Sequence, residues 1–140
     1  MRIKHIISGQ WIIYAVQSER GDCPLLKFLN GLDNSYSGHR DSLLALLEEV
    51  SGHAEKPSQW ISPKKCHTIT TDKKIWQFTV GRLRIAWFYD DGNVIICTHG
   101  FFKDSQTTKR ADQKQAQKIR DNYFLAKQQK NIKIEKEEEE

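Results

Sequence analysis

The sequence predicts an α+β fold in which strands and helices follow the order β-α-α-β-β-β-α. Residues 75–103 alternate apolar and polar side chains around two tight turns, which is typical of three antiparallel strands. Two earlier segments and one later segment carry apolar residues at helical spacing. We therefore expect one mainly antiparallel sheet, packed on the two N-terminal helices, in a single domain of residues 1–134.

The N-terminal part of the chain predicts one strand followed by two helices. The strand runs from Trp11 to Val16. Asp22 is the candidate N-cap of the first helix, because Pro24 suits a first helical turn. The second helix runs from about His39 to Ser51. Both helices have an apolar stripe, which indicates core positions: Leu25, Phe28, Leu29, Leu32, Leu43, Leu46, Leu47 and Val50.

Two-residue turns at Val80-Gly81 and Asp91-Gly92 would fix the register of the three later strands. Side chains alternate between the two faces along a strand, so one face collects the aliphatic and aromatic residues. We expect this core face to hold Trp76, Phe78, Val80, Leu83, Ile85, Trp87, Tyr89, Val94 and Ile96. A last helix, expected from Arg110 to Lys130, completes the fold.

The opposite face of these strands carries polar side chains. The expected register places Gln77 beside Arg84, Thr79 beside Arg82, and Arg84 beside His99. Two arginines and a histidine on one rigid face suit an anion, and we expect that anion to be RNA phosphate.

Charge is distributed unevenly along the chain. The formal net charge is +4, yet residues 135–140 hold five acids and one base. Without them, 21 bases and 13 acids remain, a net charge of +8. We expect a basic domain that binds a polyanion, followed by a disordered acidic tail at 135–140.

Several classes of protein are not supported by the sequence. Three widely spaced cysteines suit a reducing cytoplasm better than a disulfide framework. We expect no signal peptide and no membrane span, because no apolar run approaches about 18 residues. The five histidines lack a metal-ligand spacing, and no glycine-rich phosphate loop occurs, so neither a metal nor a cofactor is expected.

Three short motifs carry a resemblance to a known family. They are Ile75-Trp76-Gln77-Phe78-Thr79-Val80, Leu83-Arg84-Ile85-Ala86-Trp87-Phe88 and Thr98-His99-Gly100-Phe101-Phe102-Lys103-Asp104. In this order they resemble the RelE/HigB superfamily (RelE/ParE type) of bacterial toxins, in particular its phage-associated HigB-like branch. The resemblance extends more weakly over residues 11–130.

The resemblance implies a RelE-like fold and the toxin of a type II toxin–antitoxin system. It implies a metal-free endoribonuclease that cuts mRNA on the translating ribosome and so inhibits translation and growth. The implied partner is a small helix-turn-helix antitoxin. Metal-free cleavage is chemically sufficient, because RNA supplies its own nucleophile in the 2′-hydroxyl.

Six residues are candidates for the catalytic chemistry. His67 and His99 could move protons near neutral pH. Cationic side chains could stabilise the charge that develops on the phosphate: Lys64, Arg82, Arg84 and Lys103. The family's catalytic arginine corresponds to Thr79 here, and Arg82 is expected to compensate for it. Asp104 replaces a second lysine of the family motif.

Five further basic residues are expected to contact the RNA backbone: Lys65, Lys109, Arg110, Lys114 and Lys118. For all these residues the alternative is a structural or merely solvated side chain. Two other functions also remain open on the same fold. One is a non-enzymatic, ParE-like gyrase poison, and the other is a degenerate toxin that is retained as an antitoxin-binding protein.

Overall fold

The computed structural model describes residues 1–103 and 108–136. Its elements are β1 (Arg2–Ile7), β2 (Ile12–Gln17), α1 (Pro24–Asn30), the 3-10 turn η1 (Asn34–Tyr36), α2 (Ser37–Gly52), α3 (Pro57–Trp60), β3 (Cys66–Thr68), β4 (Trp76–Val80), β5 (Leu83–Asp90), β6 (Val94–Phe102), α4 (Arg110–Gln128) and β7 (Lys133–Glu135). No helix in this part of the chain is both long and apolar enough to cross a membrane.

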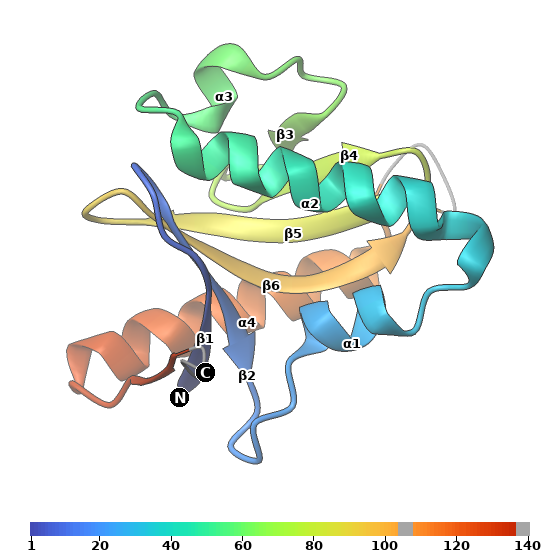
Figure 1. The fold of residues 1–140 in the computed structure, drawn as a ribbon. Coiled ribbons are helices and arrows are strands. Elements are labelled where there is room, and N and C mark those ends of the chain that lie inside the picture. The colour runs from blue at the N-terminus through green and yellow to red at the C-terminus, as the bar shows by residue number, and fades with distance from the viewer. Residues whose placement is uncertain (104–107, 137–140) are drawn as a thin grey trace.

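Within the described residues, seven strands form one sheet in the order β3-β4-β5-β6-β2-β1-β7. The pairs β2–β6 and β1–β7 are parallel, and the other neighbours are antiparallel. Figure 1 shows α1 and α2 on one side of the sheet and α4 on the other.

The predicted fold class is therefore wrong. The sheet is mixed rather than mainly antiparallel, and helices cover both of its faces instead of two N-terminal helices covering one. The order β-α-α-β-β-β-α missed β1, β3, β7 and the short helix α3. The strands β3 and β7 have three residues each, too few to show an alternating pattern.

The mixed sheet has a hydrophobic core on each face. Toward α1 and α2, the ring of Trp87 packs against Phe78 with a centroid separation of 4.6 Å. Toward α4, Phe88 packs against Tyr123 at 5.4 Å. Because β5 is buried on both faces from Leu83 to Phe88, it lies at the centre of the molecule.

The turn between β4 and β5 lies one position later than predicted, which moves every cross-strand partner by two residues. Val80 pairs with Leu83, so the turn residues are Gly81 and Arg82 rather than Val80 and Gly81. Gly81 takes a positive φ of 56°, which glycine adopts without strain. As a result Thr79 faces Arg84, and Arg82 lies in the turn itself.

The turn between β5 and β6 also differs, because Asp90 pairs with Val94 across three residues. The predicted faces of Val94 and Ile96 are consequently wrong, and Ile95 and Cys97 face α1 and α2 instead. A bulge between Cys97 and His99 then adds one unpaired residue. The longer turn and the bulge each shift the pairing by one residue and so reverse the face. Together they leave His99 on the face that carries Arg84, as predicted.

The start of the first helix was also predicted incorrectly. Cys23, not Asp22, is the N-cap of α1, and no side chain caps this end. The backbone N–H of Asp22 instead donates to Ser18 Oγ at 3.1 Å. Pro24 does occupy the first helical turn, as expected.

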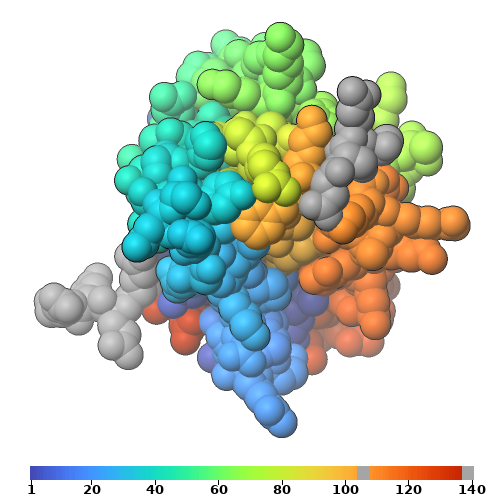
Figure 2. Space-filling view, turned by 90° about the vertical axis from the view of Figure 1, so that its right-hand side faces the viewer, coloured from blue at the N-terminus to red at the C-terminus, as the bar shows by residue number. Residues whose placement is uncertain are grey.

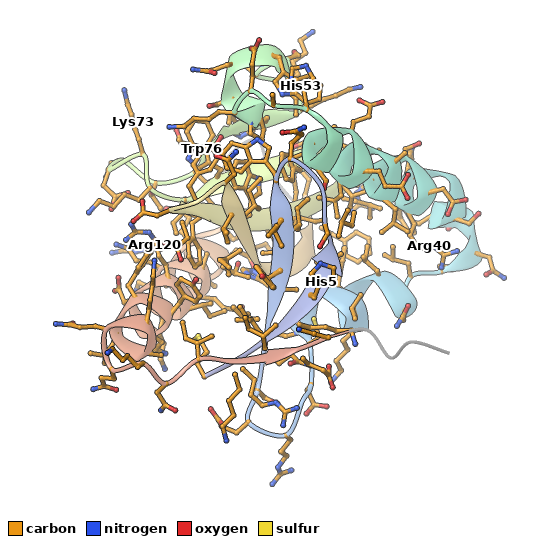
Figure 3. The ribbon with its side chains drawn as sticks, turned by 60° about the vertical axis from the view of Figure 1, so that its left-hand side comes forward. His5, Arg40, His53, Lys73, Trp76 and Arg120 are labelled. Atoms are coloured by element: carbon orange, nitrogen blue, oxygen red, sulfur yellow. The ribbon has the colours of Figure 1, made fainter. Side chains whose placement is uncertain are left out.

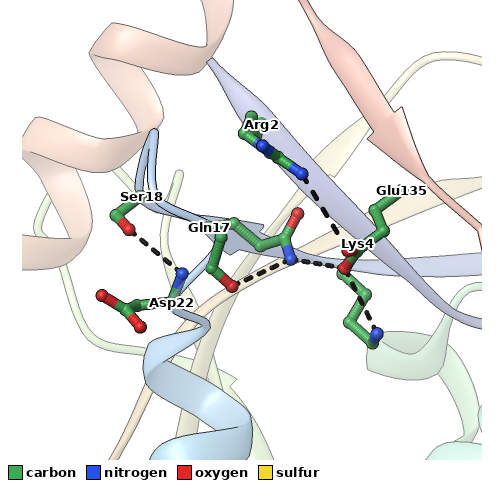
Figure 4. Close-up of polar contacts among 7 residues, drawn as sticks. Arg2, Lys4, Gln17, Ser18, Asp22 and Glu135 are labelled. Carbon is green, nitrogen blue, oxygen red and sulfur yellow. Dashed lines mark hydrogen bonds and ion pairs between the residues drawn. The ribbon is translucent and has the colours of Figure 1, made fainter.

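Glu135, where the predicted acidic tail begins, is the last residue of β7. Its Oε2 accepts hydrogen bonds from Gln17 Nε2 at 2.7 Å and from Lys4 Nζ at 3.3 Å, and Arg2 lies 3.9 Å from its Oε1 (Figure 4). These contacts lower the pKa of Glu135, first through the bond from Gln17. The tail prediction for residues 137–140 lies outside the described residues.

A hydrogen-bonded carboxylate fastens α4 to the sheet. Asp90 at the end of β5 accepts a bond from the Tyr123 hydroxyl at 2.5 Å and one from Lys127 Nζ at 2.7 Å. Burial, the largest single effect, would raise the pKa of Asp90, but these two donors, the backbone N–H of Asp91 and the charge of Lys127 together hold the pKa below its ordinary value.

The substitution Tyr123→Phe is expected to lower the free energy of unfolding by about 1–3 kcal/mol, because it removes a donor to a buried carboxylate. Urea denaturation at pH 7 measures this effect. Tyr14→Phe is the matched control and should leave the midpoint unchanged, since the Tyr14 side chain is half-exposed. Equal midpoints for Tyr123→Phe and the wild type would show that this hydrogen bond does not stabilise the packing of α4 on the sheet.

Candidate functional site

A row of polar side chains crosses the sheet on the face that carries α4. His67 in β3 pairs with Gln77 in β4, Gln77 with Ala86 in β5, and Ala86 with His99 in β6. The bulge before His99 sets this alignment, so His99 lies opposite Ala86 rather than opposite Arg84 as predicted. Two histidines from distant parts of the sequence thus lie in one row.

Hydrogen bonds determine which nitrogen of His67 carries the proton. Nδ1 lies 3.0 Å from the carbonyl oxygen of Pro63, which can only accept, so Nδ1 is the donor. Nε2 then accepts from the amide nitrogen of Gln77 at 3.1 Å. The neutral, half-exposed His67 therefore carries its lone pair on Nε2, where it is bound by Gln77; a general base needs this tautomer.

Gln77 connects His67 to the segment before α4. Its amide nitrogen also lies 3.3 Å from Thr79 Oγ1, and its Oε1 accepts from the Thr108 hydroxyl at 2.9 Å. With partners on both ends, the buried amide is held in one orientation. This orientation points its donor group at His67.

His99 is enclosed between the sheet and α4. Its side chain is buried, with a relative exposure of 4%, and Nε2 lies 3.0 Å from Asp112 Oδ1. Nδ1 lies 3.0 Å from Thr98 Oγ1. Burial lowers the pKa of His99, and the opposing effect of Asp112 does not restore it. His99 therefore anchors α4 as a neutral ring rather than facing solvent.

The stability of the protein should depend on pH through His99. Because its pKa is lower in the folded chain than the ordinary value of about 6.5, the unfolded chain binds a proton first as the pH falls. The contribution of His99 to the free energy of unfolding should be fully present above about pH 6.5. Below that pH the free energy of unfolding should decline by at most about 1.4 kcal/mol per pH unit.

Chemical denaturation of the wild type and of His99→Asn between pH 8 and pH 5 tests this dependence. The variant should be less stable at pH 8 but should show a shallower decline toward pH 5. Parallel declines in the two proteins would mean that another group is responsible.

Arg84 is buried, with a relative exposure of 6%, and faces Thr79 and Phe101 on the neighbouring strands. Its Nη1 donates to the carbonyl oxygens of Gly81 at 2.6 Å and Leu83 at 2.9 Å. Burial lowers its pKa, but an arginine remains charged at neutral pH. Arg84 thus holds the β4–β5 turn and places a positive charge beneath it.

Arg82 does not face Thr79, so its predicted place as a substitute for the missing arginine is wrong. Its guanidinium instead donates to the Tyr36 hydroxyl at 3.1 Å and to the carbonyl oxygen of Lys103 at 3.5 Å. The backbone N–H of Lys103 donates to Arg82 O at 2.8 Å. Arg82 and Lys103 are therefore exposed neighbours at the end of the sheet.

The remaining predicted basic residues are all exposed. Lys64 and Lys65 precede β3, and the carbonyl oxygen of Lys65 accepts from the backbone N–H of Thr79 at 2.9 Å. Lys109 is the N-cap of α4, and the other three follow at four-residue spacing along one side of that helix: Arg110, Lys114 and Lys118. Figure 2 shows the β4–β5 turn (yellow) between the start of α2 (cyan) and the start of α4 (orange).

The three motifs, strands β3 to β6 and the basic end of the sheet lie within one stretch that a family comparison recognises. Residues 27–121 match the family described as phage derived protein Gp49-like (DUF891). The chain belongs to this family. The Gp49-like family is of the RelE/ParE toxin type in general, whereas the predicted HigB-like specificity stays a prediction. No curated protein matches the sequence.

The site of this Gp49-like chain includes residues that the sequence did not reveal. Thr108 and Asp112 bind Gln77 and His99, but neither forms a motif with its partner. Tyr36, which accepts from Arg82, lies in a turn between two helices. Only the docking of α4 and η1 on the sheet makes these contacts. Among residues 1–103 and 108–136, no group of three or more metal-ligating side chains occurs.

Proposed function

We propose that the protein is the toxin of a type II toxin–antitoxin system and that it cleaves mRNA on the ribosome without a metal. One observation carries the proposal: His67 presents an unprotonated Nε2 on a sheet face whose end is lined by exposed cations. Membership of a Gp49-like, RelE/ParE-type family supports it. A helix-turn-helix antitoxin would cover the basic end of the sheet.

In the proposed reaction, His67 Nε2 takes the proton of a 2′-hydroxyl in place of its bond to Gln77. The 2′-oxygen forms a bond to phosphorus, and the bond from phosphorus to the 5′-oxygen breaks. The departing oxygen takes a proton from an acid such as a lysine ammonium group or water. The products are a 2′,3′-cyclic phosphate and a 5′-hydroxyl end, and no external reactant is required.

Cations would stabilise the charge on the phosphorus oxygens as this reaction proceeds. Lys65, Arg82 and Lys103 are exposed at the end of the sheet and can approach the RNA. Lys64 is also exposed and adds to the same positive field. The buried Arg84 would act on the phosphate through its positive charge without contacting it. Its guanidinium is held in place by the two carbonyl groups that it binds.

Transcript end-mapping after brief induction of the toxin tests the proposal. We expect new 5′-hydroxyl ends within translated regions, and we expect coexpression of the adjacent gene to suppress them if it encodes the antitoxin. Growth arrest without new transcript ends would contradict the nuclease.

The enclosure of Arg84 and His99 favours one alternative. If neither residue reaches RNA, a non-enzymatic toxin that poisons gyrase becomes the second candidate. It predicts broken DNA and an SOS response on induction, with intact transcripts. Absence of both signals, together with retained antitoxin binding, would indicate the degenerate toxin.

A further inference from the structure

A cavity of about 380 Å³ opens at the turn between β5 and β6. It lies at the opposite end of β5 from the β4–β5 turn that carries Arg82. Its volume is near the lower limit for small-molecule sites, which indicates a compact ligand. The residues that decide its chemistry are Trp11, Lys56, Tyr89, Asp90, Asp91 and Arg120.

Arg120 in α4 is the central feature of this cavity. Its guanidinium carbon lies 4.7 Å from the ring centroid of Phe124 and 5.9 Å from that of Phe88. Figure 3 shows Arg120 between α4 and the strands of the sheet. The side chain donates no hydrogen bond to any described residue, and its Nε is buried without a partner. A guanidinium has five donors, so ring stacking orients this one while leaving its donors available.

One further donor belongs to the same cavity. Lys56 Nζ lies 5.6 Å from the ring centroid of Tyr89. Trp11 also lines the cavity, but its indole N–H is buried and does not reach a ligand there. An arginine and a lysine only donate, so a ligand between them must supply acceptors.

The balance of charge in the cavity also favours an anion. Asp90 is already paired with Lys127 and with the hydroxyl of Tyr123, so it does not neutralise the other cations. The exposed Asp91 contributes one negative charge against the two positive charges of Lys56 and Arg120. Among the lining residues a net positive charge remains, and the walls include aromatic rings; Asp72, outside the lining, also interacts electrostatically with Arg120.

We propose that this cavity binds the phosphate of a nucleotide between Arg120 and Lys56. A phosphate offers several acceptor oxygens in an arrangement that a guanidinium can bind in a bidentate manner, and the rings of Tyr89 and Phe124 suit the attached nucleoside. The phosphate comes from a free mononucleotide or from the terminal phosphate of an RNA. This site is separate from His67 and does not depend on the proposed cleavage reaction.

Isothermal titration with 5′-AMP tests the site in the full-length protein. Arg120→Met keeps an apolar stem over Phe124 but removes every donor, and Lys56→Met changes an exposed side chain. Each should weaken binding by about tenfold or more, since bonds to charged groups contribute about 1.5–3 kcal/mol. Lys118→Met is the matched control, because Lys118 is exposed on the same helix outside the cavity and should leave binding unchanged.

Two competing ligands identify the source of the phosphate. Inorganic phosphate should bind more weakly than 5′-AMP if the nucleoside contributes. A tetraribonucleotide with a 5′-phosphate that displaces 5′-AMP would identify an RNA end, and one that does not displace it would identify a free nucleotide.

The proposal is overturned if the wild type does not bind 5′-AMP at millimolar concentration. Binding that Lys118→Met weakens as much as Lys56→Met does would equally overturn it, because the attraction would then be non-specific. Circular dichroism checks the fold of Arg120→Met. If that variant is unfolded, the comparison of Lys56→Met with Lys118→Met still decides the outcome.

Discussion

His67→Ala is expected to slow mRNA cleavage by about 10²- to 10⁴-fold, the usual contribution of a general acid or base. The imidazole donates from Nδ1 to Pro63 O, so the neutral ring accepts from Gln77 at Nε2. The other partly exposed histidine on this sheet face, His5, pairs with Tyr14 at the far side of the sheet, well away from Gln77 and the basic residues. Cleavage of a reporter transcript in a reconstituted translation reaction measures the effect.

A matched control is His5→Ala, since His5 is half-exposed on β1 and is separated from β3 by four strands of the sheet. It should cleave at the rate of the wild type. Circular dichroism and retained antitoxin binding must show that His67→Ala is folded. Full activity in a folded His67→Ala protein would exclude His67 as the base and strengthen the gyrase alternative.

Gly100→Ala is expected to lower the free energy of unfolding by about 1–3 kcal/mol, the usual cost of overpacking a core. A Cβ atom at Gly100 would lie 2.2 Å from Cδ2 and 2.7 Å from Cγ of Phe28. The ring of Phe28 also packs against Phe102 at 5.1 Å, so it cannot move away without disturbing a second aromatic contact. The glycine of the third motif is therefore required by the packing of α1 on β6.

Gly38→Ala is the control for this effect, because nothing lies within 4 Å of a Cβ atom at Gly38. Gly38 is within α2, where alanine has a higher helix propensity than glycine, so this variant should be unchanged or slightly more stable. The denaturation midpoints of both variants provide the comparison. A wild-type midpoint for Gly100→Ala would show that Phe28 can repack without loss.

The sequence predicted the elements whose patterns are long. The second helix, expected from about His39 to Ser51, is confirmed within α2, and the last helix, expected from Arg110, begins at that residue. Strands β4, β5 and β6 also occur where residues 75–103 predicted them. Long strands and helices can be recognised in a sequence because the spacing of their apolar residues repeats several times.

The departures have local physical causes. The turn at Gly81-Arg82 and the three-residue turn before Val94 involve positive φ angles at Gly81, Gly92 and Asn93. A glycine that serves as the first rather than the second residue of a turn changes every cross-strand partner after it. No residue pattern signals the bulge before His99, since the unpaired residue is an ordinary threonine.

The candidate site was predicted as a set of residue types but not as an arrangement. His67 and His99 were identified, and both lie in one row of the sheet. Their difference in exposure could not be foreseen, because it depends on how α4 covers the sheet and binds His99 through Asp112. The contact of Arg82 with Tyr36 depends in the same way on a turn between helices.

The parallel strand pairs have a consequence for how the chain folds during its synthesis. β2 pairs with β6, and β1 pairs with β7 across almost the whole chain, with Lys4 and Glu135 separated by 131 residues. Contacts of such long range form slowly, and domains fold as units while they are translated. Strands β1 and β2 can pair with each other early, but their outer partners β7 and β6 are translated much later. The toxin proposed above would stay inactive toward the ribosome that makes it until β6 and β7 have emerged.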